Sequence, residues 1–123
     1  MKYVGIVLIS HSSKLVSGLL EIIRQVIHDV PIEVAGGTDE GEIGTSVEKI
    51  VTAIDRANVG NGVLVFYDLG SAMMNAEVAL EMIDSNTVKI INAPLVEGAY
   101  VAAVESNMGK SLQDVYDAVM KEF

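Results

Sequence analysis

Short apolar runs and amphipathic segments alternate along the chain, and this alternation constrains the fold more than any other feature. Four runs rich in Val, Ile and Leu have the pattern of strands covered on both faces: Tyr3 to Ser10, Ile32 to Ala35, Val63 to Tyr67 and Val88 to Asn92. A segment with helical spacing follows each run. Such alternation predicts an α/β fold, an open four-stranded parallel sheet with helices on both faces and right-handed crossovers.

Five helices are expected between and after these strands. They are Lys14 to His28, a helix opened by Thr45 with Glu48 in the capping-box position, Ala72 to Ile83, the segment "LVEGAYVAAVESNMG" after Pro94, and a last helix capped by Ser111. The first helix carries two adjacent rows of apolar residues. Together they form an apolar stripe that is wider than packing against one face of a sheet requires. We expect the surplus to form a subunit interface.

Length and composition favour one domain, residues 1–123. The chain has 123 residues, half of them hydrophobic, and no linker or internal repeat separates two parts. It contains no Cys, which excludes disulfides, thiolate metal sites and a cysteine nucleophile. Two His without any Cys offer no plausible zinc ligand set, so we expect no metal.

Charge narrows the choice of partners. The formal net charge is -9, which disfavours binding to nucleic acid or anionic membranes and favours basic partner proteins. No apolar stretch approaches the roughly 20 residues of a membrane span, and the run after Met1 lacks the cleavage site of a signal peptide. We therefore expect a cytoplasmic protein.

Polar residues follow two of the expected strands directly. The first strand ends in "SHSS", which contains His11, and the third ends in "DLGSA", which contains Asp68. If the strand order is 2-1-3-4, the reversal lies between these two strands, and ligands bind at that point. His11 and Asp68 would then meet. Asp68 would orient the imidazole and leave its other nitrogen as a base, a metal ligand or a nucleophile, an orientation that favours Nε2 for attack.

Residues around this pair could hold an anion. Gly70, Ser71 and Ala72 open a helix whose first N–H groups lack partners, and further donors are expected from Ser12, Ser13, Gly37 and Thr38. A nucleophilic nitrogen beside a group of hydrogen-bond donors that can bind an anion suggests phosphoryl transfer through a phosphohistidine. Purely structural roles compete with this interpretation, because a histidine at a strand end and an aspartate before a helix are often only caps.

Other phosphate-binding motifs do not fit. Gly109-Lys110-Ser111 imitates the end of a P-loop, but the first glycine of the motif would fall at Val104 and no strand precedes it. A receiver-like domain phosphorylated on Asp68 would need acidic residues after the first strand, where the chain has Ser-His-Ser-Ser.

Four motifs in order resemble one known family. The stretches "VLISHSSKLVSGL", "GGTDEGEIGTS", "LVFYDLGSAMMNAE" and "NAPLVEGAYVAAV" are similar to the mannose-type enzyme IIA family of the phosphoenolpyruvate-dependent phosphotransferase system. Within that family they resemble most the phosphotransferase subunits of dihydroxyacetone kinases. The resemblance covers nearly the whole chain and implies the strand order 2-1-3-4 and a homodimer.

The resemblance also implies a reaction and its partners. His11 would accept a phosphoryl group from the phosphocarrier HPr and pass it to ADP held by the DhaL subunit, which phosphorylates dihydroxyacetone bound to DhaK. Asp68 would orient His11, and Ser71 with its neighbours would contact the phosphoryl group. The chain would hold no cofactor of its own. Two alternatives remain open, a sugar-transport enzyme IIA component and a non-catalytic anion-binding regulatory module.

Relatives of this family can end in a strand that crosses to the dimer partner. Here the last segment, "SLQDVYDAVMKEF", has helical spacing, so we expect a helix instead. Dimerisation would then rest on another face, such as the wide apolar stripe of the first helix.

Overall fold

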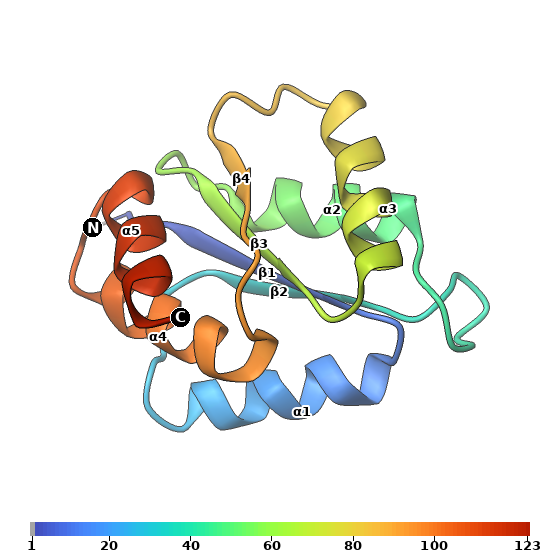
Figure 1. Ribbon diagram of the computed structural model, residues 1–123, viewed down its shortest axis with the longest axis horizontal. Helices are drawn as coiled ribbons and strands as arrows, with labels where there is room; N and C mark the ends of the chain where they lie inside the picture. The colour runs from blue at the N-terminus through green and yellow to red at the C-terminus, as the bar shows by residue number, and fades with distance from the viewer. Residues whose placement is uncertain (1) are drawn as a thin grey trace.

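The computed structural model describes residues 2–123, which form a four-stranded sheet and five helices (Figure 1). The strands are β1 (Gly5–Ser10), β2 (Ile32–Gly36), β3 (Val63–Tyr67) and β4 (Val88–Ile90). The helices are α1 (Ser13–Arg24), α2 (Val47–Ala57), α3 (Gly70–Glu81), α4 (Leu95–Asn107) and α5 (Leu112–Glu122).

The sheet is parallel throughout and has the order β2-β1-β3-β4, which confirms the predicted fold class. In the register, Ile6 lies between Ile32 of β2 and Leu64 of β3. The chain therefore reverses its direction of winding between β1 and β3, and the carboxyl ends of these two strands are neighbours.

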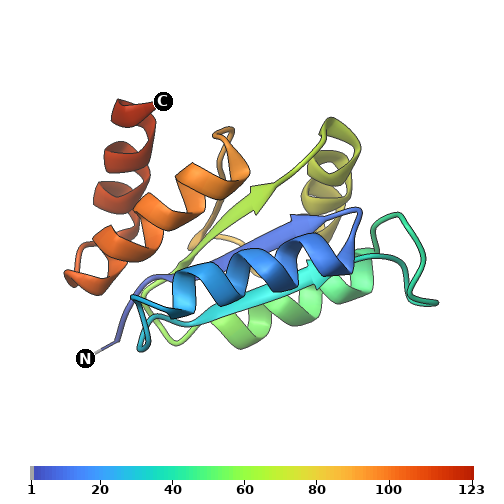
Figure 2. The same cartoon turned by 90° about the horizontal axis from the view of Figure 1, so that it is seen from below.

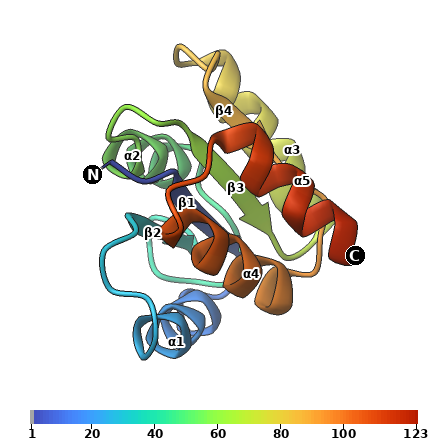
Figure 3. The same ribbon diagram turned by 90° about the vertical axis from the view of Figure 1, so that its left-hand side faces the viewer.

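Two hydrophobic cores lie on opposite faces of the sheet because successive side chains of β1 point to opposite sides. Ile6 and Leu8 pack with α1, α4 and α5, whereas Val7 and Ile9 pack with α2 and α3. Figures 2 and 3 show the same layers, with α1 and α4 on one side of the sheet and α2 and α3 on the other. The apolar residues of β1 are fully buried, as expected for a strand covered on both faces.

Several element ends differ from the sequence-based expectations. α1 ends at Arg24 rather than His28, and the Arg24 side chain donates hydrogen bonds to the backbone carbonyls of Ile27 and His28. β4 ends at Ile90 rather than Asn92, and α3 begins at Gly70 and ends at Glu81. Helix ends fray and local hydrogen bonds compete with them, so periodicity alone places them poorly.

The predicted cap at Thr45 is wrong. Ser46 is the N-cap of α2, and its hydroxyl accepts the Lys49 N–H at 3.2 Å. The Thr45 hydroxyl instead accepts a hydrogen bond from the Asn75 side chain on α3. Either residue type can cap a helix, and the tertiary contact to Asn75 decides between them. This contact also ties the loop after β2 to α3.

The last segment is a helix, α5, with a cap at Ser111, as predicted. It packs against α4 (Figure 3).

The apolar residues of α1 are only partly covered by the rest of the chain. Val16, Leu19 and Ile23 are buried, whereas Leu15 and Ile22 are exposed, with 44% and 57% of their surface accessible. The surplus apolar surface predicted for α1 is therefore present on the single chain.

Close packing at Gly36 sets the approach of α1 to the end of β2. A Cβ atom at this position would lie 2.6 Å from the Ser13 Cα and 2.7 Å from a Val16 methyl. We expect Gly36→Ala to lower the free energy of unfolding by about 1–3 kcal/mol, the usual cost of overpacking. Urea denaturation would measure the change.

Gly18 provides the matched control. It lies within α1, and a Cβ atom there would meet nothing within 4 Å. Gly18→Ala should therefore stabilise the protein by about 0.5–1 kcal/mol through the higher helix propensity of alanine. Equal stability of the two variants would contradict the steric argument at Gly36.

Candidate functional site

His11 and Asp68 lie in contact at the point where the strand order reverses. His11 directly follows β1 and Asp68 directly follows β3, and the parallel pairing of these strands brings both exit loops to one edge of the sheet. The His11 Nδ1 is 3.0 Å from the Asp68 Oδ1. Both side chains are accessible at the surface, with exposed fractions of 21% and 14%.

Asp68 is held by four hydrogen bonds. Its Oδ2 accepts the His11 backbone N–H at 2.9 Å and the Ser10 hydroxyl at 2.8 Å. Its Oδ1 accepts the Leu69 N–H at 2.7 Å and faces the His11 ring. Burial raises the pKa of this carboxyl group, but these hydrogen bonds, led by the His11 N–H, together outweigh burial and hold the pKa below its ordinary value. Asp68 is therefore ionised at neutral pH.

The ionised carboxylate fixes the tautomer of the neutral His11 ring. A carboxylate only accepts hydrogen bonds, so the ring proton lies on Nδ1 and the lone pair lies on Nε2. The Ser71 Oγ is 2.8 Å from Nε2 and donates its proton to that lone pair. The arrangement runs from carboxylate through imidazole to hydroxyl, and it presents Nε2 toward the start of α3.

The start of α3 lies beside the ring. Gly70 and Ser71 are the first residues of this helix, whose initial N–H groups have no carbonyl partner inside it. The Ala72 N–H donates to the Leu69 carbonyl at 2.9 Å, and its side chain is buried. Among the three predicted residues at this helix start, Gly70 and Ser71 thus have the polar groups best placed for an anion.

The other predicted phosphoryl-binding residues build the loops around the site. Ser12 caps α1 by accepting the Leu15 N–H. The Gly37 N–H donates to the Ser10 carbonyl, and its φ of 75° lies in the region that glycine favours. The Thr38 hydroxyl accepts the Glu42 N–H. These contacts shape the loops, and no hydrogen bond joins these three residues to the His11 ring.

Two contacts at the site were not predicted from the sequence. The fully buried Ser10 hydroxyl supports Asp68, and the Gly44 N–H donates to the His11 carbonyl at 2.9 Å. The contact of Ser10 had a signal in the sequence, since a buried serine at the end of an otherwise apolar strand needs a polar partner. The second depends on the course of the loop after β2, which local sequence does not define.

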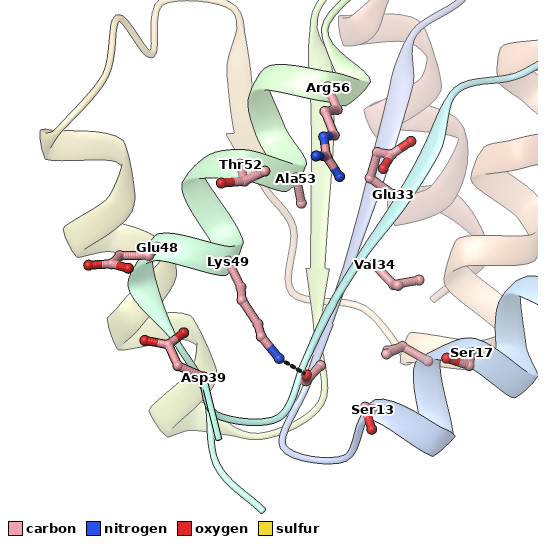
Figure 4. Close-up of a pocket in the computed structure, with 12 residues that line it drawn as sticks. Ser13, Ser17, Glu33, Val34, Asp39, Glu48, Lys49, Thr52, Ala53 and Arg56 are labelled. Atoms are coloured by element: carbon pink, nitrogen blue, oxygen red, sulfur yellow. Dashed lines mark hydrogen bonds between the residues drawn. The ribbon is translucent and has the colours of Figure 1, made fainter. Parts of the chain in front are cut away.

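A groove of about 430 Å³ lies along the outer edge of β2, between α1 and α2. Figure 4 shows Lys49 and Arg56 of α2 and Glu33 of β2 along it, with the Lys49 Nζ donating to the Gly36 carbonyl at 3.1 Å. Neither His11 nor Asp68 lines this groove. His11 therefore lies outside this groove, with its side chain partly accessible at the surface.

Residues 2–123 contain no cluster of three or more potential metal-ligating side chains. Among the same residues, no helix combines the length and the apolar character that crossing a membrane requires.

Fold and site together define an α/β domain with an oriented histidine at the switch point of a parallel sheet. The chain matches the EIIA-man family, described as the "PTS system fructose IIA component", over residues 5–116. The chain belongs to this family, the mannose-type enzyme IIA family that its motifs resemble.

Two relatives match the chain over most of both lengths. One from Lactococcus lactis subsp. lactis is 39% identical over 95% of this chain and 94% of its own length, and is named "PTS-dependent dihydroxyacetone kinase, phosphotransferase subunit DhaM". One from Listeria innocua is 44% identical over 85% of this chain and 82% of its own, and is named "PEP-dependent dihydroxyacetone kinase 1, phosphoryl donor subunit DhaM".

Solved structures share the fold. A crystal structure of a protein of unknown function, EF1359, has a TM-score of 0.88 at 32% identity and covers 98% of this chain, with 95% of its own length matched. The phosphotransferase system component EIIA from Streptococcus agalactiae has a TM-score of 0.71 at 16% identity, over 96% of this chain and 90% of its own. This second likeness supports the fold alone.

Proposed function

We propose that this chain is the phosphoryl donor subunit of a phosphoenolpyruvate-dependent dihydroxyacetone kinase and works as a phosphohistidine relay. The observation that carries the proposal is the alignment of Asp68, His11 and Ser71, which leaves Nε2 as the nucleophilic ring nitrogen. Membership of the EIIA-man family and the names of the two DhaM relatives support the choice of reaction.

In the first step, the phosphocarrier HPr delivers a phosphoryl group from its own histidine. The Nε2 lone pair of His11 attacks phosphorus in line, the new N–P bond forms, and the electron pair of the broken bond returns to the ring of the carrier. The positive charge that develops on the His11 ring is stabilised by Asp68, 3.0 Å away on the Nδ1 side. The Ser71 hydroxyl, freed from Nε2, can donate to a phosphoryl oxygen.

In the second step, a terminal oxygen of ADP bound to DhaL attacks the phosphorus of phospho-His11. The Nε2–P bond breaks, its electron pair returns to the ring, and ATP is regenerated on DhaL for the phosphorylation of dihydroxyacetone on DhaK. Gly70 and Ser71 provide the donors that would hold the phosphoryl oxygens at the start of α3. We expect the reaction to take place in the cytoplasm, where these proposed partners would act.

A homodimer is part of the proposal. The exposed apolar residues Leu15 and Ile22 on α1, continued by Val26 beyond its end, form a strip that a second copy would cover. The strip begins at Leu15 in the first turn of α1, four residues after His11, so a dimer built there would hold two relay sites close to its interface.

The test is an intact-mass experiment on the whole chain. Incubation with phosphoenolpyruvate, enzyme I and HPr should add one phosphoryl group, and the bond should be acid-labile, as expected for a phosphohistidine. Addition of DhaL with ADP should remove the group and form ATP. A label that stays on after DhaL and ADP are added, but leaves on addition of a sugar-transport enzyme IIB, would favour the sugar-transport alternative. No added mass would favour an anion-binding regulatory module.

A further inference from the structure

Ser10 differs from the other buried hydroxyl group of the described chain. Ser10 and Ser106 are the buried polar side chains of residues 2–123, and both have no accessible surface. The Ser106 hydroxyl donates to the Val4 backbone carbonyl at 2.6 Å, an ordinary way to satisfy a buried group. The Ser10 hydroxyl instead binds the Asp68 carboxylate, which itself holds the reactive ring.

The direction of each hydrogen bond at Ser10 is defined by chemistry. The Ser12 backbone N–H lies 3.0 Å from the Ser10 Oγ and can only donate, so the Ser10 oxygen accepts there. The Asp68 Oδ2 lies 2.8 Å from the same oxygen and can only accept, so the Ser10 proton points at the carboxylate. The polar chain therefore runs in one direction, from the start of α1 through Ser10 to Asp68 and its contact with His11.

We propose that Ser10 is a positioning residue, which holds Asp68 so that the neutral His11 ring keeps its proton on Nδ1 and its lone pair on Nε2. Among the four donors to Asp68, two are backbone N–H groups and one is the His11 ring itself. Ser10 is the remaining donor, and it belongs to a rigid strand between β2 and β3. The Ser12 N–H also polarises the Ser10 hydroxyl, which strengthens the hydrogen bond that this hydroxyl donates to Asp68.

Removal of the hydroxyl would have two local consequences. Oδ2 would keep one donor instead of two, so the carboxylate could rotate away from the ring. The Ser12 N–H at the start of α1 would lose its acceptor. With the carboxylate less well fixed, the ring can populate its other tautomer, in which Nε2 carries the proton and cannot attack phosphorus. This role deepens the proposed function and, for its kinetic part, rests on it.

Two variants at position 10 and one control test the role. Ser10→Ala deletes the hydroxyl with little change in volume, Ser10→Thr retains it, and Ser106→Ala deletes a buried hydroxyl that lies far from His11 in the sequence and bonds only Val4. Nitrogen-15 spectra of the unphosphorylated proteins at about pH 8.5, where imidazoles are neutral, report the tautomer directly. Circular dichroism confirms folding.

We expect a single Nδ1–H tautomer for His11 in the wild type, Ser10→Thr and Ser106→Ala, and a mixture in Ser10→Ala. The rate of phosphoryl transfer from HPr should fall about tenfold in Ser10→Ala alone, the effect of one charge-assisted hydrogen bond. A wild-type spectrum and rate in Ser10→Ala, with a loss of stability like that of Ser106→Ala, would overturn the proposal. So would mixed tautomers in Ser106→Ala.

The nitrogen-15 spectra and the rate of phosphoryl transfer test the role of Ser10 and the proposed relay separately. The spectra are recorded without any partner, so they judge the positioning role even if His11 accepts no phosphoryl group. Absence of phosphorylation in the wild type would refute the relay, whereas a normal relay with an unchanged tautomer in Ser10→Ala would refute only the role of Ser10.

Discussion

Replacement of His11 by alanine should abolish phosphorylation completely. Alanine offers no atom that could take the place of Nε2, and the hydroxyl beside it, Ser71, has no base to activate it once the ring is gone. Intact mass after incubation with phosphoenolpyruvate, enzyme I and HPr should therefore show one added phosphoryl group on the wild type and none on His11→Ala. ATP formation on DhaL should be lost with it.

The second histidine of the chain supplies the matched control. His28 is exposed beyond the end of α1, and its backbone carbonyl accepts a hydrogen bond from Arg24. His28→Ala should accept and release the phosphoryl group like the wild type. Labelling of His11→Ala at the wild-type level would remove His11 from the mechanism and direct attention to His28.

The fold was predictable because the strands carry an unambiguous signal. Each strand is a short Val- and Ile-rich run, and the helices between them make parallel pairing the expected arrangement. The same reasoning placed His11 and Asp68 together, although they lie 57 positions apart in the sequence, because strand ends that share a sheet edge bring their loops together.

Contacts that depend on tertiary structure were not predictable in this way. Thr45 and Ser46 are adjacent and equally suited to cap α2, and the hydrogen bond between Thr45 and Asn75 decides which one does. Ser10 reads as the last residue of a strand, and its hydroxyl gains a role only through Asp68 on the neighbouring strand. In both cases the deciding partner is distant in sequence, so local pattern carries no information about it.

Replacement of Asp68 by asparagine should slow phosphoryl transfer by a factor on the order of 10⁴, which is what loss of the orienting carboxylate costs in a catalytic triad. The reason lies in the number of donors around the group. Each carboxylate oxygen accepts one backbone N–H, from His11 on one side and Leu69 on the other. An amide has only one acceptor oxygen, so either orientation places its NH₂ group against a backbone N–H.

Both orientations also harm the His11 ring. If the amide NH₂ faces Nδ1, the ring turns to the tautomer with its proton on Nε2 and loses its nucleophile. If the oxygen faces Nδ1, the NH₂ group meets the His11 N–H and the side chain is pushed out of place. Neither orientation supplies the negative charge that stabilises the phosphorylated ring.

The measurement is the rate of labelling by HPr under single-turnover conditions, together with the free energy of unfolding in urea. We expect Asp68→Asn to lose about 1–3 kcal/mol of stability because a backbone N–H group is left without its acceptor. Asp55→Asn, at an exposed position on α2, should change neither quantity. A folded Asp68→Asn protein that is labelled as fast as the wild type would show that the carboxylate only supports the loop, because the rate of attack by Nε2 would then be independent of the group that holds Nδ1.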